Sequence, residues 1–164
     1  MRAPLRLLAL AVVGLASTAA LASPAAASRE APTVQGHTNT QLTADTCKSY
    51  AGVRMTRPGF PVFIVDEDGY RRGINSAATY DRLFSTWDGI RTDIPLEVCP
   101  ERAPLSDDAE LIRADGYPVF LYTNGERHGI NSAEAFNKYH FAWDKIHVVS
   151  EAVLRHIPEG AIWA

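Results

Sequence analysis

The sequence predicts an α+β fold of two duplicated units, and three observations carry this prediction. The pentapeptide GINSA occurs at residues 73–77 and again at residues 129–133. Around it, ten of the twenty-two positions in residues 69–90 are identical in residues 125–146. Each copy also joins a β-rich run to an Asn-Ser pair. Two copies, and not the three or more of a solenoid, indicate an internal pseudo-two-fold arrangement.

Each copy begins with a predicted β-hairpin. The runs PVFIV at residues 61–65 and PVFLY at residues 118–122 are rich in β-branched and aromatic residues. They lead to Asp68-Gly69 and Asn124-Gly125, dipeptides that accept positive φ at a tight turn. The return strands are then YRRGI and ERHGI.

A short helix and a third strand should follow each hairpin. Asn75-Ser76 and Asn131-Ser132 are good N-caps, because their side-chain oxygens can accept an amide hydrogen of the first turn. Aromatic side chains at helical spacing predict a buried face. We expect four aromatic residues to be core residues and not a ligand platform: Trp87, Trp143, Phe63 and Phe120. The third strands begin at Ile90 and Ile146, and only the second copy continues into a last helix, residues 151–157, capped by Ser150.

The N-terminus has the pattern of a secretory signal peptide. Arg2 and Arg6 precede an apolar run that is short for a membrane span, and alanines follow it. We place cleavage after Ala27, with Ala22 as the alternative, and expect no membrane anchor afterwards. The predicted organisation is a signal peptide at 1–27, a disordered lead-in at 28–46, a first unit at 47–99, a connector at 100–110 and a second unit at 111–164.

Net charge and cysteine content indicate which partners and which cellular compartment the protein suits. Without residues 1–27 the chain has 14 basic and 19 acidic side chains, which gives a net charge of −5 and argues against nucleic acid as a partner. Cys47 and Cys99 would enter an oxidising compartment, so one intramolecular disulfide is expected. A free thiol pair or an intermolecular bridge is the alternative.

The repeated motifs resemble a known kind of module. The pattern G-x-P-V-F-L, G-x-R-x-x-I-x-S, W-D-x-I and V-S-E-x-x-L-x-x-I-P-x-G is similar to a tandem repeat of uncharacterised secreted and surface proteins of bacteria. The similarity covers residues 59–94 and 111–160. Two departures stand out: Gly73 and Gly129 replace a larger residue, and the first copy lacks the closing helix. The resemblance implies no catalytic activity.

Few side chains indicate catalysis or metal binding. Four of the five histidines lie in the second copy: His128, His140, His147 and His156. Their spacing matches no metal motif, and His140 falls at a core position. Asp66-Glu67-Asp68-Gly69 resembles the start of a calcium loop, but Ala77 stands where an EF-hand needs its bidentate glutamate. We therefore expect no catalytic residue, no cofactor and no metal.

The sequence favours a secreted, non-catalytic binding module acting outside the cell or at the cell wall. Its predicted partner is a cell-wall glycan or an extracellular protein. The predicted binding residues, on the return strands, are Arg71, Arg72, Arg127 and His128. Two alternatives stay open, a small secreted hydrolase that uses the second-copy histidines and an inhibitor of a secreted enzyme.

Overall fold

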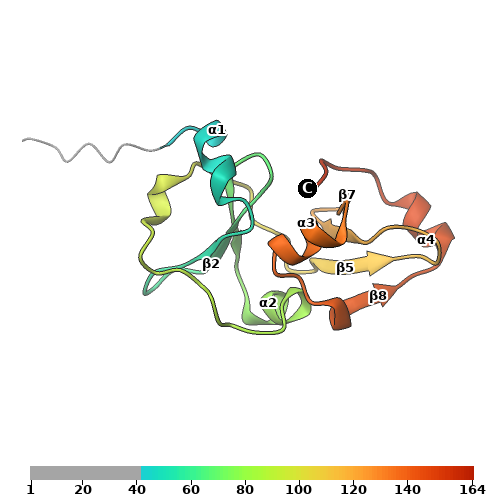
Figure 1. Cartoon of the computed structure of the whole chain (residues 1–164). Coiled ribbons are helices and arrows are strands. Elements are labelled where there is room, and N and C mark those ends of the chain that lie inside the picture. The colour runs from blue at the N-terminus through green and yellow to red at the C-terminus, as the bar shows by residue number, and fades with distance from the viewer. Residues whose placement is uncertain (1–41) are drawn as a thin grey trace, which may run out of the picture. The chain divides into compact units, whose positions relative to one another are not determined.

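The computed structural model describes residues 42–164, so the predicted signal peptide and most of the predicted lead-in lie outside the described residues. The described chain contains two four-stranded sheets with short helices (Figure 1), which confirms an α+β fold of two similar units. The lead-in was expected to lack structure as far as Thr46. Its end instead forms α1 (Ala44–Cys47), because Thr43 caps the helix and Cys47 anchors it.

Each of the two sheets contains the same antiparallel arrangement of three strands. In the first, the order is β1-β2-β3-β4, with β1 at Arg54–Met55, β2 at Val62–Val65, β3 at Arg71–Ile74 and β4 at Glu101–Arg102. In the second, the order is β7-β6-β5-β8, with β5 at Glu110–Arg113, β6 at Phe120–Thr123, β7 at Glu126–Gly129 and β8 at Ile146–Val148. The β1-β2-β3 and β5-β6-β7 meanders correspond in register, since Arg54 pairs with Ile64 as Leu111 pairs with Leu121.

The units differ at their outer strands. The predicted third strand forms in the second unit, where β8 pairs in parallel with β5, but in the first unit it is only a bridge between Arg91 and Met55. Conversely, β4 pairs in parallel with β3, whereas the second unit has isolated parallel bridges there, between Arg127 and Glu159 and between Ile130 and Trp163. Because β4 lies within residues 100–110, the predicted connector is partly sheet.

The second hairpin turn has the two-residue form that its sequence predicts, and the first is wider. Asn124 and Gly125 both have positive φ, 54° and 79°, which is the two-residue turn that their types predict. The first turn is longer, with positive φ only at Gly69. There the carboxylate of Asp66 accepts the N–H groups of Asp68 and Tyr70 at 3.1 and 2.8 Å and holds the wider loop.

The helices begin at the predicted serines. Ser76 caps α2 (Ala77–Leu83), Ser132 caps α3 (Ala133–Lys138) and Ser150 caps α4 (Glu151–His156), each by accepting an amide hydrogen three residues later. The remaining turns are 3₁₀ helices: η1 (Lys48–Tyr50), η2 (Leu96–Val98) and η3 (Trp143–Lys145). In the first unit η2 takes the place of the closing helix. Among residues 42–164, none of the helices has the length and apolar character needed to cross a membrane.

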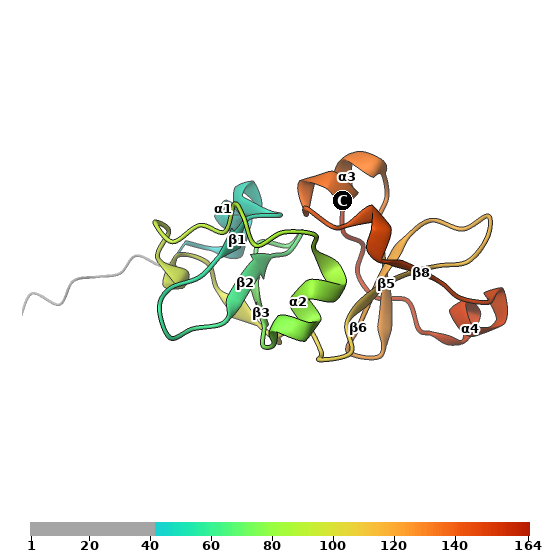
Figure 2. The ribbon, with the colours of Figure 1, turned by 90° about the horizontal axis from the view of Figure 1, so that it is seen from below.

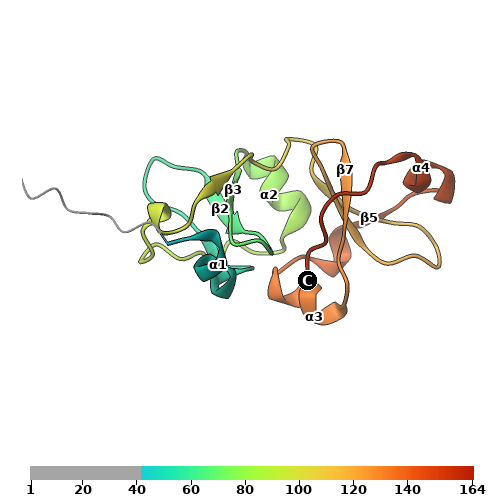
Figure 3. The ribbon, with the colours of Figure 1, turned by 90° about the horizontal axis from the view of Figure 1, so that it is seen from above.

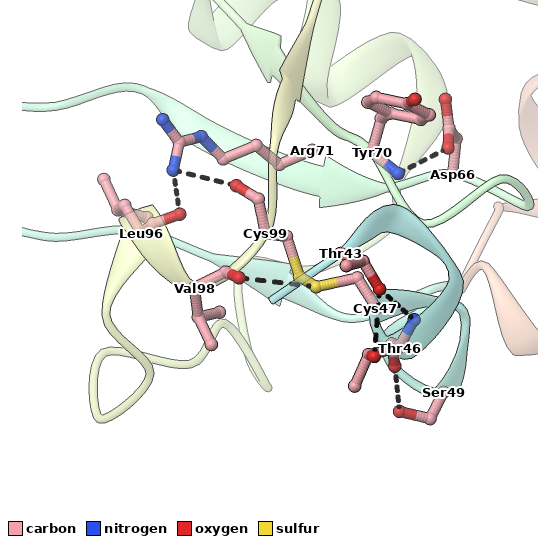
Figure 4. The surroundings of a disulfide bond; sticks show 10 residues. All are labelled: Thr43, Thr46, Cys47, Ser49, Asp66, Tyr70, Arg71, Leu96, Val98 and Cys99. Carbon is pink, nitrogen blue, oxygen red and sulfur yellow. Dashed lines mark hydrogen bonds between the residues drawn. A yellow bond between two sulfur atoms is a disulfide. The ribbon is translucent and has the colours of Figure 1, made fainter. Parts of the chain in front are cut away.

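The predicted disulfide joins Cys47 and Cys99, whose Cα atoms are 5.7 Å apart (Figure 4). Both cysteines are buried in a small cluster with Met55, Phe63 and Leu96. The bridge connects α1 to the segment after η2, so it closes the first unit.

One larger hydrophobic cluster is shared by both units. It contains Ile64, Tyr80 and Phe84 from the first unit, and Phe136 and Trp163 from the second. The final segment returns beside β7 (Figure 3), where the N–H of Trp163 donates to the carbonyl of Gly129 at 2.8 Å. The two units are therefore packed together by common core residues.

Candidate functional site: two tryptophan clefts

Arg71 and Arg127 occupy equivalent places and make equivalent internal contacts. Arg71 donates to the carbonyls of Leu96 and Cys99 (Figure 4). It also pairs with Glu101 at 2.8 Å. Arg127 likewise donates to the carbonyl of Leu154 and pairs with Glu159. Each guanidinium also lies 5.3 Å from a phenylalanine ring of the preceding strand. Both arginines thus connect the return strand to the segment that closes each unit.

Arg72 and His128 are buried. Arg72 Nε donates to Asp66 at 2.8 Å, and Nδ1 of His128 is 2.8 Å from the carbonyl oxygen of Ala161. The structure therefore places all four predicted binding residues in internal contacts and does not bring them together in a groove. Their binding role stays an untested prediction, and their contacts direct the search for a site elsewhere.

The histidines of the second unit are also dispersed. His147 contacts Glu110 at 2.9 Å, whereas His156 contacts the carbonyl of Ala152 in its own helix. Within residues 42–164, no three His, Cys, Asp or Glu side chains are grouped so that they could hold a metal ion.

His140 is exposed, so its prediction as a core position was wrong. It follows the end of α3 with φ of 58°. Its N–H donates to Asn137 O, and the N–H of Phe141 donates to Phe136 O, which is the hydrogen-bond pattern of a Schellman C-cap. Because the helix ends at Lys138, helical spacing no longer places residue 140 on the buried face.

We expect His140→Gly to raise the free energy of unfolding by about 1 kcal/mol at pH 8, because glycine adopts positive φ without strain. The gain should grow at pH 5. Although the residue is exposed, its ring is partly desolvated, and this effect and, secondarily, Arg54 lower the pKa of His140 in the folded protein. The unfolded chain then binds the proton first as the pH falls through about 6.5, so this histidine costs stability at low pH.

Urea unfolding at pH 8 and pH 5 would measure both effects of His140→Gly. Asn124→Gly changes the other non-glycine residue of positive φ in the described chain and removes no titratable group, so it is the matched control. Its effect should be equal at the two pH values. An equal effect of His140→Gly at both values would contradict the titration argument.

Trp87 and Trp143 are half-exposed, at 48% and 51%, so their prediction as core residues was wrong. Phe63 and Phe120 are buried, as predicted. The error has a structural cause. The helices end at Leu83 and Lys138, and each tryptophan comes several residues later, where the helical period no longer applies.

Each tryptophan lines a cleft, and the two clefts are built from equivalent residues. The Trp87 cleft has a volume of about 350 Å³ and the Trp143 cleft about 190 Å³. Both lie between the start of the hairpin's first strand and the start of the helix. The shared lining of the Trp87 cleft is Pro61, Val62, Ile74, Asn75, Ser76, Ala77 and Tyr80. The corresponding residues of the Trp143 cleft are Pro118, Val119, Ile130, Asn131, Ser132, Ala133 and Phe136.

Both indoles are held in fixed orientations. Trp87 stacks on Tyr80 with ring centroids 3.9 Å apart, and its Nε1 donates to Asp81 at 2.9 Å. Trp143 packs on Phe136 at 4.0 Å, and its Nε1 donates to Asn137 at 3.0 Å. Because a buried ring backs each indole and its N–H is already bonded, the exposed part is an ordered apolar surface.

The asparagine of each GINSA motif lies in the same cleft. Serine supplies the helix cap, so capping does not account for Asn75 or Asn131. Both asparagines are exposed, and neither side-chain amide hydrogen-bonds to any residue within 42–164. Each amide carries two donors and an acceptor that a ligand can use.

Among residues 42–164, no charged side chain lines either cleft. This neutral lining separates them from the charged surfaces around the arginines. Such a lining suits an uncharged group better than a charged one, since a charge placed against it would lose water and gain no ionic partner from the lining.

The Trp87 cleft is the larger because it has a second exposed aromatic wall. Phe60 lines it and is 48% exposed, while Arg57 lies 3.9 Å from the centre of its ring. The equivalent residue of the second unit, Tyr117, instead donates a hydrogen bond to Glu151 of α4 at 2.8 Å. The closing helix thus draws this aromatic group out of the Trp143 cleft.

A buried arginine supports the loop that carries Trp87. Arg54 donates to the carbonyls of Thr86 and Asp88, on either side of the tryptophan, at 3.1 and 2.8 Å, and also to the hydroxyl of Tyr80. Leu111 takes this position in the second unit. Sequence analysis missed Arg54 because its strand is only two residues long.

Comparison of the chain with family models, curated proteins and solved structures gives no match.

Proposed function

We propose that the protein is an extracellular binding module for uncharged glycans, and that the Trp87 and Trp143 clefts hold the sugar rings. The observation that carries the proposal is the duplication of one arrangement: a half-exposed, oriented indole beside an asparagine amide that has no hydrogen-bond partner within residues 42–164. A scaffold alone explains neither residue, because both side chains leave the core.

The chemistry of the clefts suits a sugar ring. A pyranose has an apolar C–H face and a rim of hydroxyl groups. The face can stack on an ordered indole, which offers a large apolar area at small entropic cost. The hydroxyl groups, or an acetamido group, can exchange hydrogen bonds with Asn75 or Asn131. Charged wall polymers fit less well because the lining is neutral.

Action outside the cell is supported by the sequence and by the cross-link. The first 27 residues have the pattern of a signal peptide, and a buried disulfide is typical of proteins that mature in an oxidising compartment. A wall or another insoluble glycan would then be accessible to the clefts.

Co-sedimentation with chitin, cellulose and purified cell wall, each at low and high salt, tests the proposal. We expect wild type to bind at least one matrix at both salt concentrations, because screening weakens charged contacts far more than stacking. Trp87→Ala should weaken binding about thirtyfold, as expected when a central aromatic contact is lost. Trp143→Ala should have a smaller effect, and the double variant should stay in the supernatant.

Val153→Ala is the control, because it removes an exposed apolar side chain from α4, outside both clefts. Full retention of the double tryptophan variant would contradict the proposal. Retention that disappears at high salt would instead favour a charged surface and the originally predicted arginines.

A small hydrolase is the second candidate, and one contact favours it. Nδ1 of His147 lies 2.9 Å from a carboxylate oxygen of Glu110. Both side chains line an open groove. A carboxylate beside a histidine can orient the imidazole so that it acts as a general base. Release of soluble sugar from the bound matrix, lost completely in His147→Ala, would establish this function. The non-catalytic module predicts no release.

A further inference from the structure

A third cleft, of about 260 Å³, lies where the two units meet. Its lining comes from α2, from β5 and from the η3–β8 segment: Asp81, Arg82, Glu110, Asp144, Lys145 and His147. We call it the polar groove. It differs from the tryptophan clefts because every lining side chain is ionisable.

The polar groove is next to both tryptophans. Its Asp81 is the residue that accepts the hydrogen bond of the Trp87 indole, at 2.9 Å. Its Asp144 directly follows Trp143 in the chain and accepts a hydrogen bond from Ser85 at 3.3 Å. The groove is thus linked to the Trp87 indole by a hydrogen bond and to Trp143 by chain adjacency.

The spacing of these parts is fixed by backbone contacts between the units. The N–H of Ala142 donates to the carbonyl of Leu83, at the end of α2, at 2.9 Å. Figure 2 shows α2 beside the chain that runs into β8. The shared core, with Phe84 and Phe141 rings 5.7 Å apart, lies behind this junction. Because this hydrogen bond and the shared core join the two units, we expect a ligand to meet a largely pre-ordered surface.

We infer that the polar groove is the middle of one extended glycan-binding path, and that a single polysaccharide chain contacts Trp87, the groove and Trp143 together. This inference rests on the proposed glycan-binding function. The outer rings of the bound segment stack on the indoles. The inner rings present hydroxyl groups to the groove, where charged side chains make stronger hydrogen bonds than neutral ones.

Chain length should then control affinity. A short oligosaccharide reaches one cleft, whereas a long one engages both clefts through a rigid connection and gains from the high effective concentration of the second contact. A long repeating polymer, and not a free sugar, is therefore the ligand class that this surface selects.

Calorimetry with β-1,4-linked oligosaccharides of glucose and of N-acetylglucosamine, with two rings and with eight rings, tests the inference. We expect two short molecules per protein but only one long molecule, bound at least about a hundredfold more tightly. The double variant Lys145→Ala/His147→Ala should reduce the affinity for the long molecule about tenfold, by losing polar contacts in the groove. Its affinity for the short molecule should not change.

Lys48→Ala removes a cation from η1, outside the three clefts, and should leave both affinities unchanged. Equal affinities for long and short molecules, at two per protein, would overturn the inference but leave the glycan-binding function intact. No reduction in the groove variant would also overturn it. If neither length binds and no matrix retains the protein, the proposed function itself fails.

Discussion

Removing the Cys47–Cys99 disulfide is expected to lower the free energy of unfolding by about 4 kcal/mol. The bridge spans 52 residues, and chain-entropy arguments assign about this value to a loop of that length. It connects α1 to the end of the first unit, whose β1 and β4 have only two residues each. So short a sheet has few hydrogen bonds to resist opening once the constraint is lost.

Urea unfolding of Cys47→Ala/Cys99→Ala measures this loss. Wild type with excess reductant is the parallel control, because it lacks the bridge but keeps both cysteine side chains. Both should unfold at similarly low urea. Hydrogen exchange should show faster opening near η1 and η2, the two turns that flank the bridge. An unchanged unfolding midpoint in the double variant would contradict the account.

The repeated architecture was predictable because its signals are local. Hairpin turns, serine caps and a pair of cysteines each act within a few residues or through one covalent bond. Asn124-Gly125 formed the expected turn, and Ser76 and Ser132 started the expected helices. The shortest strands gave no such signal, because β1 and β4 depend on pairing partners far along the chain.

The candidate site was not predictable, because its residues are placed by the path of the chain after each helix and by distant strands. Spacing alone extends the buried face of α2 from Tyr80 to Trp87, but the backbone becomes extended at Phe84 and the indole turns outward. Likewise, Arg71 and Arg72 read as exposed residues of an edge strand. They are covered because β4 adds to that edge. Its Glu101, thirty positions later, pairs with Arg71, whereas Arg72 pairs with Asp66 of the same hairpin.

The asparagine of GINSA shows what comparison of the two copies can still add. A residue that both copies need for folding should have an internal partner in both, as Arg71 and Arg127 do. Asn75 and Asn131 are repeated but have no such partner within the described residues. Repetition without such a contact supports the proposed ligand contacts, which the sequence alone could not separate from scaffold.

The second large effect is expected for Trp163→Ala, which should lower the free energy of unfolding by about 3 to 5 kcal/mol. Trp163 is 2% exposed, and its ring lies 4.8 Å from Tyr139 and 5.9 Å from Phe141 in the cluster that both units share. The backbone beyond it is also held, because the N–H of Ala164 donates to Glu67 of the first hairpin at 3.1 Å. The substitution would therefore leave a cavity at the junction of the two units.

Urea unfolding of Trp163→Ala, followed by fluorescence and by circular dichroism, would measure this effect. Ile162→Ala is the neighbouring control, since Ile162 is 53% exposed and should change stability by less than about 0.5 kcal/mol. Because one cluster serves both units, we expect a single transition that shifts as a whole. Two separate transitions in wild type would show that the units unfold independently. That result would also remove the fixed spacing of the tryptophan clefts on which binding of one continuous glycan chain depends.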